Sequence, residues 1–589
     1  MGYRDRAAVA ALCVALSALT MTPSRASAGG FYLLERGTRS LGRGGAFVAG
    51  ADDPSALWMN PAGIGFAGEQ LVVDATLGFL DVSYTRIDSG GNPMPTVHGH
   101  NAPLPIPTIA GTFDFGLEHF HFGAGVFAPN AALMSYPQEL TVDGMPYPAP
   151  QRYSLLTMEG SLIATIAVGA AWTPLPDELS IGLAVHGVVG AFAARVALSA
   201  CDGAICTFPE DPEYDGIAQM NLSPIITASV VGGVTWNPGP VRLGASFSTP
   251  FSLSGDASID VRAPSAAAFE GSLTRHRPDS GPCSVAEAPD EEVQADPNHP
   301  CRDTTAAVNL NFPFILRVGA ELLAVENLRL EASFVWETWS LQREVSVVPN
   351  DVWIVDALNF LDYEIGAMNI PRNMRDTFSV RLGGEYTIDG SYQVRLGGYW
   401  ESGSFDDAYL SPLTIDSDKI VVAGGFSMRL FDGVWGDVMV GYAHLFGRQV
   451  RNSQVTQQNP IRPPAPERGP VYVGNGDYSF TLPFVGVGMR WQADWAPPTA
   501  PVEEEPVPSE ATPVEDPAVD PSQPWYQQSS GAQAEPVTTV PPGTETPTST
   551  DAPAASEEET PDVTEETQTE DRPRRGRGRR GGRGRRPPR

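Results

Sequence analysis

SYQVRLGGYWE, residues 391–401, is the stretch of sequence that decides the fold. In an extended chain successive side chains point to opposite faces, so this segment has one apolar face and one polar face. The apolar face carries Tyr392, Val394, Leu396 and Trp400, and the polar face carries Gln393, Arg395, Tyr399 and Glu401. One face suits lipid and the other suits a wet lumen, which is the pattern of a transmembrane β-strand.

The same alternation recurs along residues 69–493, in about fourteen segments of roughly 10 to 20 residues separated by Gly, Pro, Asn and Asp clusters. We expect the third, fourth and tenth strands at residues 119–128, 152–173 and 376–389. Beyond residue 28 no stretch of about 20 residues is apolar and free of Gly, Pro and charge, which argues against spanning helices. A closed barrel is the other structure that can cross a bilayer. The sequence therefore predicts an all-β protein, a transmembrane antiparallel β-barrel.

The N-terminal 28 residues have the features of a secretory signal peptide. Arg4 and Arg6 precede an apolar run, and Ala26-Ser27-Ala28 offers a cleavage site. We predict cleavage after Ala28 and export to the bacterial outer membrane.

Residues 29–68 follow the signal and are rich in glycine. Gly, Pro and Asp recur too often for a regular helix or a central strand. This segment is predicted to form a compact, irregular plug, or hatch, and Asn60-Pro61-Ala62 lies within it.

Four of the five cysteines remain after export, because Cys13 lies in the signal. Cys201 and Cys206 form a close pair, and Cys283 and Cys301 form a wider one. In an oxidising compartment two loop disulfides, Cys201–Cys206 and Cys283–Cys301, are the economical interpretation, although four cysteines allow three connectivities.

The C-terminal tail differs sharply from the barrel. The formal charge of −32 is partly local, because residues 496–571 hold 18 acidic residues and no Lys or Arg. Residues 494–571 are rich in Pro, Glu and Thr, and residues 572–589 are rich in Arg and Gly. Such segments cannot bury enough apolar area to fold, so we expect disorder. The basic run is expected to bind an anionic envelope polymer or the acidic stretch; export removes nucleic acid as a partner.

Catalytic motifs are absent from the sequence. It contains no nucleophile elbow, zinc-protease motif, P-loop or dinucleotide fingerprint. His98-Gly99-His100 has no evident third ligand, so no metal site is predicted. We expect neither enzymatic activity nor a cofactor.

The arrangement resembles the FadL family of outer-membrane transporters. The resemblance begins with GGFYLLERGTRSLGRGGAFVAGADDPSALWMNPAGI (29–64) and covers residues 29–493. It continues through HFHFGAGVFAPN (119–130), FPFILRVGAELL (312–323), RLEASFVWETWS (329–340) and residues 391–419.

The resemblance implies a hatch motif at Asn60, Pro61 and Ala62, and a kinked third strand that opens the wall toward lipid. Gly123, Gly125, Phe127 and Pro129 would belong to that lateral gate. It also implies hydrophobic ligands, long-chain fatty acids or aromatic hydrocarbons. We expect a monomer in outer-membrane lipid.

For a fatty acid, an inward arginine could pair with the carboxylate in an otherwise apolar pocket. The candidates are Arg317, Arg381, Arg395 and Arg490. The alternative is that these arginines are lumen charges that hold the barrel together. They would then be balanced by Glu321, Glu337, Glu385 and Glu401.

The leading hypothesis is transport of hydrophobic compounds, most simply long-chain fatty acids, by capture at outer loops, a lumen pocket above the hatch and lateral release through the third strand. The alternative is a structural or nonselective barrel that anchors an envelope-binding tail. The glycine-rich plug favours the first.

Overall fold

The computed structural model describes residues 34–128, 134–201, 206–276, 303–357, 361–414, 416–459 and 469–493. The predictions for the signal peptide, the tail, Pro129 and the Cys283–Cys301 pair lie outside the described residues. Within those ranges no helix is long and apolar enough to cross a membrane.

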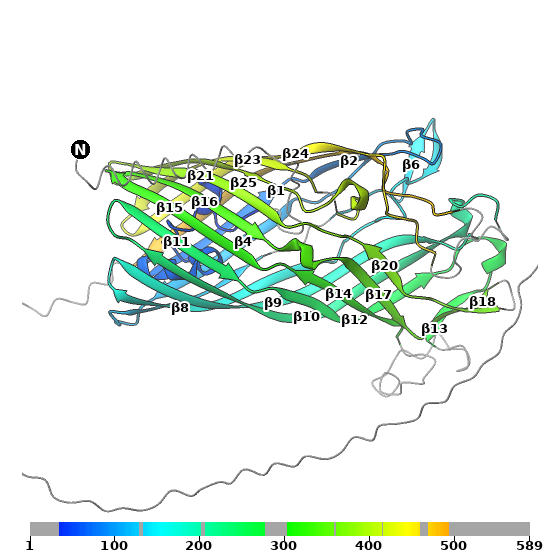
Figure 1. Ribbon diagram of the computed structural model, residues 1–589, viewed down its shortest axis with the longest axis horizontal. Helices are drawn as coiled ribbons and strands as arrows, with labels where there is room; N and C mark the ends of the chain where they lie inside the picture. Colours follow the sequence, from blue (N-terminus) through cyan, green and yellow to red (C-terminus); the bar gives the residue numbers. More distant parts are fainter. Residues whose placement is uncertain are drawn as a thin grey trace, which may run out of the picture. The chain divides into compact units, whose positions relative to one another are not determined.

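The described chain forms a closed antiparallel barrel of 14 strands, as predicted (Figure 1). Some strands consist of two labelled segments in series. The ladder closes where β1 pairs with β25, from Gln70 opposite Gln492 to Gly78 opposite Phe484. In chain order the strands are β1 (Gln70–Gly78) with β2 (Asp81–Arg86), β4 (Leu104–Phe113), β5 (Phe120–Phe127), β8 (Leu162–Leu175), β9 (Leu179–Ser199), β10 (Asp215–Trp236), β11 (Val241–Ser248) with β12 (Phe251–Arg262), β14 (Thr305–Phe312) with β15 (Ile315–Val325), β16 (Leu328–Glu337) with β17 (Glu344–Asn350), β20 (Met368–Pro371) with β21 (Thr377–Ile388), β22 (Tyr392–Glu401), β23 (Lys419–Phe431), β24 (Val434–Val450) and β25 (Gly476–Gln492).

The inside and outside faces follow the alternation in the sequence. In β22, Leu396 is 68% exposed on the outer face, whereas its neighbour Arg395 is 2% exposed in the lumen. The same division holds in β21, where Leu382 faces outward and Arg381 inward. Since a charge on the lipid face is costly, this division fixes the register of each strand.

Two strand boundaries differ from the sequence prediction. The fourth strand begins at Leu162 and not at residue 152, because Arg152 turns into the lumen, where its Nε donates to Asp215 at 2.6 Å. The tenth strand begins earlier than predicted, with β20 at Met368. The segment 149–161 therefore fills the lumen and does not form wall.

Shorter elements lie in the long loops. β3 (Val97–His98) pairs with β2, and β6 (Glu139–Val142) forms a hairpin with β7 (Met145–Pro148). A separate three-stranded sheet consists of β13 (Leu273–His276), β18 (Val352–Ala357) and β19 (Leu361–Glu364). A disulfide joins Cys201 to Cys206, whose Cα atoms are 5.5 Å apart.

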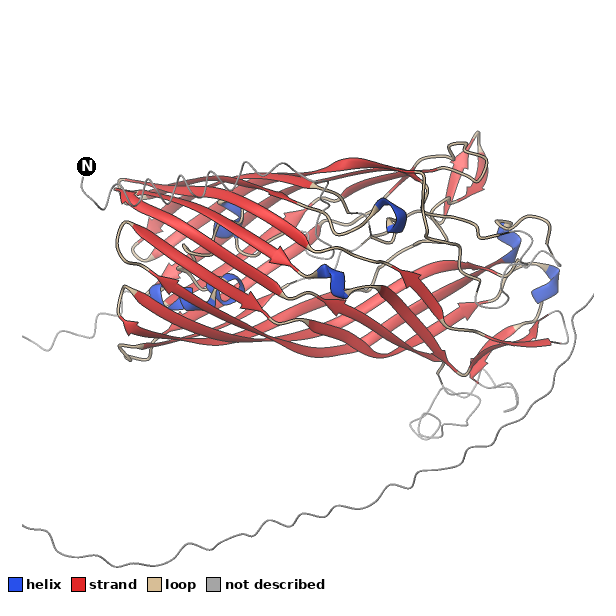
Figure 2. Cartoon of the chain, in the orientation of Figure 1, coloured by secondary structure: helices blue, strands red, loops and turns tan. Residues whose placement is uncertain are grey.

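The hatch is a plug of short helices inside the barrel (Figure 2). It contains α2 (Thr38–Gly42), α3 (Ala56–Met59) and the 3-10 helix η2 (Pro61–Phe66), joined by irregular chain. Its last helix lies near the β8–β9 turn, since Ser180 Oγ donates to Ala62 O at 2.7 Å. Short turns of this kind face the periplasm in outer-membrane barrels, so the hatch closes the periplasmic half.

Candidate functional site

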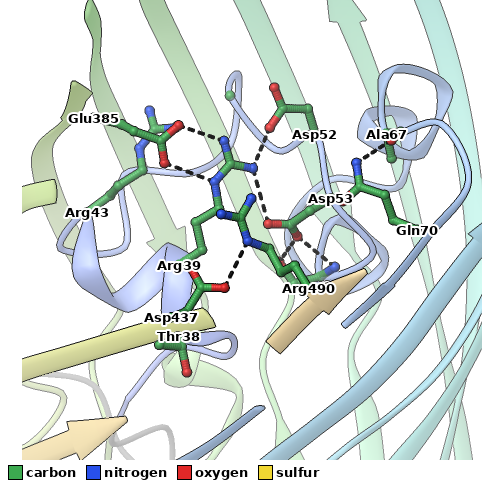
Figure 3. Close-up of polar contacts among 12 residues, drawn as sticks. Thr38, Arg39, Arg43, Asp52, Asp53, Ala67, Gln70, Glu385, Asp437 and Arg490 are labelled. Atoms are coloured by element: carbon green, nitrogen blue, oxygen red, sulfur yellow. Dashed lines mark hydrogen bonds and ion pairs between the residues drawn. The ribbon is translucent and has the colours of Figure 1, made fainter. Parts of the chain in front are cut away.

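The hatch is fastened to the wall by buried ion pairs that centre on Arg39 (Figure 3). Arg39 Nε and Nη2 donate to the two Glu385 oxygens at 3.0 and 2.9 Å, and Nη1 donates to Asp52 at 2.7 Å. A bidentate guanidinium–carboxylate pair fixes orientation as well as distance. Burial raises the pKa of Asp52, but Arg329 and Arg39 outweigh this effect and hold it well below its ordinary value. The hatch is therefore tied to β21 by charge.

A second buried attachment uses Glu331 of β16. Its carboxylate accepts hydrogen bonds from three consecutive hatch N–H groups, those of Val48 at 2.6 Å, Ala49 at 3.1 Å and Gly50 at 2.9 Å. Arg43 Nη2 lies 3.4 Å from the same carboxylate and 2.8 Å from Glu321. Successive backbone N–H groups aimed at one point form an anion-binding nest. Here the carboxylate of Glu331, a side chain of the barrel wall, occupies this nest.

Asn60 joins the predicted hatch motif to β10. Its Nδ2 donates to Val48 O at 2.9 Å and Thr235 Oγ1 at 3.0 Å, and its Oδ1 accepts from Ala62 N at 3.3 Å. Asn60 is fully buried. The side chain therefore caps η2 and holds two parts of the hatch against the wall.

Glycines on the wall allow the hatch backbone to approach closely. A Cβ at Gly383 or Gly397 would lie 1.9 or 2.1 Å from Arg43 O, and one at Gly182 would lie 2.3 Å from Ala62 N. Such distances leave no room for any side chain. Wall glycines whose added Cβ would come within 3.4 Å of a hatch atom are Gly123, Gly169, Gly182, Gly233, Gly244, Gly319, Gly383, Gly397, Gly425 and Gly486.

An apolar cavity lies in the lumen toward the outer loops. Its walls come from strands β9, β10, β12, β14, β17 and β20 and from the 149–161 segment. Its apolar lining includes Phe192, Met220, Leu253, Leu310, Val347 and Ile370. Ligand pockets are mostly apolar with a few placed polar groups, and the lining of this cavity has that character.

Arg372 is the arginine that lines this cavity. It is 2% exposed, its Nη1 donates to Thr414 Oγ1 at 2.7 Å, and its guanidinium carbon lies 5.8 Å from the Phe405 ring centroid. Among the described residues no carboxylate oxygen lies within the 4 Å ion-pair distance of Arg372. A buried charge without a counter-charge is costly. The position therefore favours an anionic ligand group.

Among the described residues, the ladder between β4 and β5 is shorter than the ladders on either side of it. The β4–β5 ladder runs only from Phe113 opposite Phe122 to Thr108 opposite Phe127, whereas β4 continues to Leu104 alongside β1. On the other side β8 continues to Leu162 alongside β9. Beyond the pair of Thr108 and Phe127, the described residues form no ladder that joins β4 to β8.

Comparisons with known proteins agree with this architecture. Residues 19–467 match the family model described as outer membrane protein transport protein (OMPP1/FadL/TodX). The chain belongs to this family. The match covers well over half of the chain, and with the 14-stranded barrel it makes the protein a bacterial outer-membrane transporter of hydrophobic compounds and not an enzyme.

Solved structures of FadL-type proteins share the fold. A FadL homologue of Pseudomonas aeruginosa is 16% identical, with a TM-score of 0.58 and coverage of 79% of this chain and 100% of that one. The toluene transporter TodX of Pseudomonas putida is 13% identical, with a TM-score of 0.48 and coverage of 75% and 94%. No curated protein matches in a comparison of sequences.

The arginines predicted from the sequence lie lower in the lumen of this FadL-type barrel. Arg395 Nε and Nη1 lie 2.5 and 3.1 Å from Glu385 and Asp437, and Arg490 Nε lies 2.9 Å from Asp437. Arg381 pairs with Glu35 of the hatch and lies 3.8 Å from Glu401. None of these three lines the apolar cavity.

Arg317 and Arg381 both border a small polar space above the hatch. Leu34, Glu35 and Trp58 of the hatch also border it. Arg317 Nη1 donates to Ser248 Oγ at 3.2 Å. Burial raises the pKa of Glu35, but Arg381 and Arg317 outweigh it and hold this pKa at about 2. This space therefore carries a hatch carboxylate between two wall arginines.

The residues predicted for the third strand lie where its inner face meets the hatch. Phe127 packs against Trp58 in a tilted arrangement, with ring centroids 5.7 Å apart, and Gly123 faces Leu57. A Cβ at Gly125 would lie 2.7 Å from that of Ala110 on β4. The described strand carries no register shift against β4 or β8.

Arg372 was not among the arginines predicted from the sequence, because it precedes the tenth strand predicted at residues 376–389. Its signal in the sequence is weak: an arginine directly after the short apolar segment Met368–Pro371. That segment is β20, which continues the tenth strand and directs Arg372 into the lumen.

Proposed function

We propose that this chain moves long-chain fatty acids across the outer membrane. The carboxylate is bound at Arg372, the acyl chain occupies the apolar cavity, and the ligand leaves sideways through the wall between β4 and β8. Arg372 carries the proposal, because among the described residues it has no carboxylate within 4 Å and an aromatic hydrocarbon offers this guanidinium no counter-charge.

The cavity suits both parts of a fatty acid. A carboxylate beside Arg372 would supply the charge-assisted hydrogen bonds that Thr414 alone does not. Aliphatic and thioether side chains such as Leu310 and Met220 would surround the chain. Thioethers adapt to irregular ligand shapes, so Met158, Met220 and Met368 favour a flexible chain.

Lateral release suits an apolar ligand. The hatch below the cavity is fastened by ion pairs and by backbone contact with wall glycines. A sideways exit keeps the acyl chain out of bulk water, which the hydrophobic effect favours. We assign that exit to the wall at β5, the third strand.

The alternative, a nonselective or structural barrel that anchors the tail, gives no role to the buried, unpaired Arg372. It also predicts leakage of small hydrophilic solutes. The hatch fills the periplasmic half of the lumen and argues against such leakage.

Uptake assays test the proposal. Cells that lack their own fatty-acid transporter would express the wild type, Arg372→Gln or the control Arg375→Gln, and receive radiolabelled long-chain fatty acid or an alkylbenzene. Arg375 follows three residues later, but its side chain is 44% exposed and lies 3.8 Å from Asp406. Hydrogen bonds to charged groups contribute about 1.5–3 kcal/mol. We therefore expect Arg372→Gln to weaken fatty-acid uptake by about tenfold or more, while Arg375→Gln changes little.

The alkylbenzene separates the substrate classes. It should be taken up poorly by all three proteins, or equally by all three, since it does not use the charge. Equal fatty-acid uptake by the wild type and Arg372→Gln would contradict carboxylate capture. Uptake of neither compound by a folded wild type would favour the structural barrel.

A further inference from the structure

A buried carboxylate, that of Asp74 on β1, faces the hatch and has no basic partner. Asp74 is 6% exposed, and in the described part of the chain no Lys, Arg or His nitrogen lies within the 4 Å ion-pair distance of it. Its Oδ2 accepts from the hatch N–H of Thr38 at 2.9 Å, whereas its Oδ1 has no hydrogen-bond partner among the described residues. Buried charges in proteins are paired or coordinate metal ions. Asp74 therefore needs a counter-charge that the described side chains do not supply.

Two other carboxylates act electrostatically on Asp74, and both are paired with arginines (Figure 3). Asp53 and Asp437 each repel the negative charge of Asp74. Asp53 lies 3.3 Å from Arg39, and Asp437 lies 2.9 Å from Arg490. Those arginines balance other carboxylates, so the charge of Asp74 remains.

Hydroxyl groups of the wall and of the hatch border a small space beside Asp74. A Cβ at Gly486 would lie 2.9 Å from Thr76 Oγ1 and 3.2 Å from Thr38 Oγ1, so both hydroxyls face the same point. A Cβ at Gly488, opposite Asp74 on β25, would lie 2.6 Å from Asp74 Cβ and 3.5 Å from Thr38 Oγ1. The two glycines keep this space open, because a side chain at either position would reach into it.

Thr108 of β4 supplies a third hydroxyl. It lies directly opposite Asp74 in the β1–β4 ladder, where the Cβ atoms of facing residues are about 4.5–5.5 Å apart. Its hydroxyl is near the carboxylate but outside normal hydrogen-bond geometry. Buried polar atoms in native proteins have partners, so a group of orphaned oxygens indicates bound water or a bound ion. The buried oxygens without a hydrogen-bond partner among the described residues are Asp74 Oδ1, Thr38 Oγ1, Thr76 Oγ1 and Thr108 Oγ1.

A monovalent metal ion matches these four atoms. All are oxygens, which hard cations prefer as ligands. The single carboxylate supplies one negative charge, which one positive charge neutralises and two would exceed. Water could satisfy the hydroxyls, but it would leave the buried charge of Asp74 without compensation.

We propose that these four oxygens bind a monovalent alkali cation, Na⁺ or K⁺, which attaches the start of the hatch to β1 and β4. Thr38 is the first residue of α2, so the ion joins this helix to the wall. None of the four residues lines the apolar cavity, and the site is independent of the proposed substrate. The attachment of α2 then depends on the ions of the periplasm, whereas the buried ion pairs of the hatch do not.

The test uses the purified full-length barrel in detergent, in NaCl, KCl or N-methylglucamine chloride at equal ionic strength and pH. Hydrogen exchange of the hatch peptide that contains Thr38 is followed by mass spectrometry, and the width of the sodium NMR resonance is measured in NaCl. Asp74→Asn removes the charge but keeps an oxygen that can accept from Thr38 N. The control Asp81→Asn makes the same change at an exposed carboxylate.

We expect Na⁺ or K⁺ to slow exchange of this peptide in the wild type and in Asp81→Asn. The slowing relative to N-methylglucamine should be about tenfold when the concentration of the ion is about ten times its dissociation constant. Where Na⁺ slows exchange, it should also broaden the sodium resonance, and Asp74→Asn should lose both effects. Slowing by one salt alone identifies the ion.

Equal exchange of the wild-type peptide in all three salts would overturn the inference, since the space would then hold water or a protonated carboxyl group. Slowing that persists in Asp74→Asn would also overturn it, because the ion would act elsewhere. Loss of the protection on addition of EDTA would show a divalent ion and contradict the assignment.

A second variant keeps the test decisive if Asp74→Asn does not assemble. Thr76→Val removes one oxygen ligand and nearly preserves the shape of the side chain, so it should weaken the effect of the ion on exchange. An effect as large as in the wild type would overturn the site.

Discussion

Charge is used in opposite ways in the two halves of the lumen. Around the hatch, Arg39, Arg43 and Arg329 each lie within 3 Å of a carboxylate oxygen. In the apolar cavity toward the outer loops, Arg372 has no carboxylate within 4 Å among the described residues. Paired charges in a buried site give orientation, whereas an unpaired one is available to a ligand. The same residue type therefore fastens the plug below and is free for recognition above.

The largest effect is expected from removing the carboxylate of Glu331, which attaches the hatch to the barrel wall. Glu331→Ala would leave Arg43 without one partner and three hatch N–H groups without an acceptor. Removing one member of a buried pair costs about 3–5 kcal/mol. We expect the hatch to loosen and the single-channel conductance in planar bilayers to rise sharply.

The matched control is Glu326→Ala, because Glu326 is exposed in the β15–β16 turn close to Glu331 in the chain. It should leave the conductance unchanged. A Glu331→Ala barrel as tight as the wild type would show that the ion pairs do not hold the hatch.

A smaller rise in single-channel conductance is expected from Gly397→Val. The new Cβ would lie 2.1 Å from Arg43 O and 2.7 Å from Gly44 N, so the hatch must shift. Overpacking costs typically about 1–3 kcal/mol. Gly424→Val on the next strand is the control, since the nearest atom to its Cβ is 3.5 Å away. Conductance that rises equally in both variants would mean that valine perturbs the strands and not the contact with the hatch.

Much of this comparison could be predicted from the sequence, because the alternation in segments such as 391–401 determines which side chains enter the lumen. It predicted the 14 strands and placed Arg395 inside. It could not show that Arg395 and Arg490 share Asp437, since that depends on the register between β22, β23, β24 and β25. Pairing across strands is a tertiary property and leaves no local signal.

Arg372 lay beyond such reasoning for another reason. It follows a four-residue strand, too short to show alternation. Only the folded lumen shows that no carboxylate of the described part of the chain lies within 4 Å of it. The hatch was predicted as an irregular plug, but its attachment to wall glycines needs the three-dimensional approach of two backbones. Sequence therefore gives the faces of the strands more readily than the partners of their charges.

An intermediate effect, confined to the outer loops, is expected from Cys201→Ser/Cys206→Ser. Closing so short a loop contributes about 2 kcal/mol by the chain-entropy account. We expect faster amide hydrogen exchange near residue 201, while fatty-acid uptake stays at the wild-type level because neither cysteine lines the apolar cavity. Reduced uptake would mean that this loop also shapes capture, and unchanged exchange would mean that other contacts order it.

An effect that depends on pH is expected at the boundary between the two halves, at Asp416. This carboxylate accepts hydrogen bonds from Ser404 N at 2.7 Å and Ser404 Oγ at 2.8 Å. It lies two residues from Thr414, the partner of Arg372. Burial raises the pKa of Asp416 to about 7, more than Lys419 and Ser404 lower it.

The pKa of an Asp in an unfolded chain is about 4, so the folded protein holds this proton more tightly than the unfolded one. The stabilising contribution is fully present below about pH 4 and is lost as the pH rises through 7. We expect wild-type stability to fall by at most about 1.4 kcal/mol per pH unit over this range relative to Asp416→Asn. Denaturant unfolding in lipid vesicles measures this difference.

The control is Asp432→Asn, which changes a side chain that is 98% exposed, and its stability should vary with pH as that of the wild type does. If the stability of the wild type and that of Asp416→Asn change with pH in the same way, Asp416 does not titrate in this range. Asp416 would then be permanently charged, like the carboxylates around the hatch.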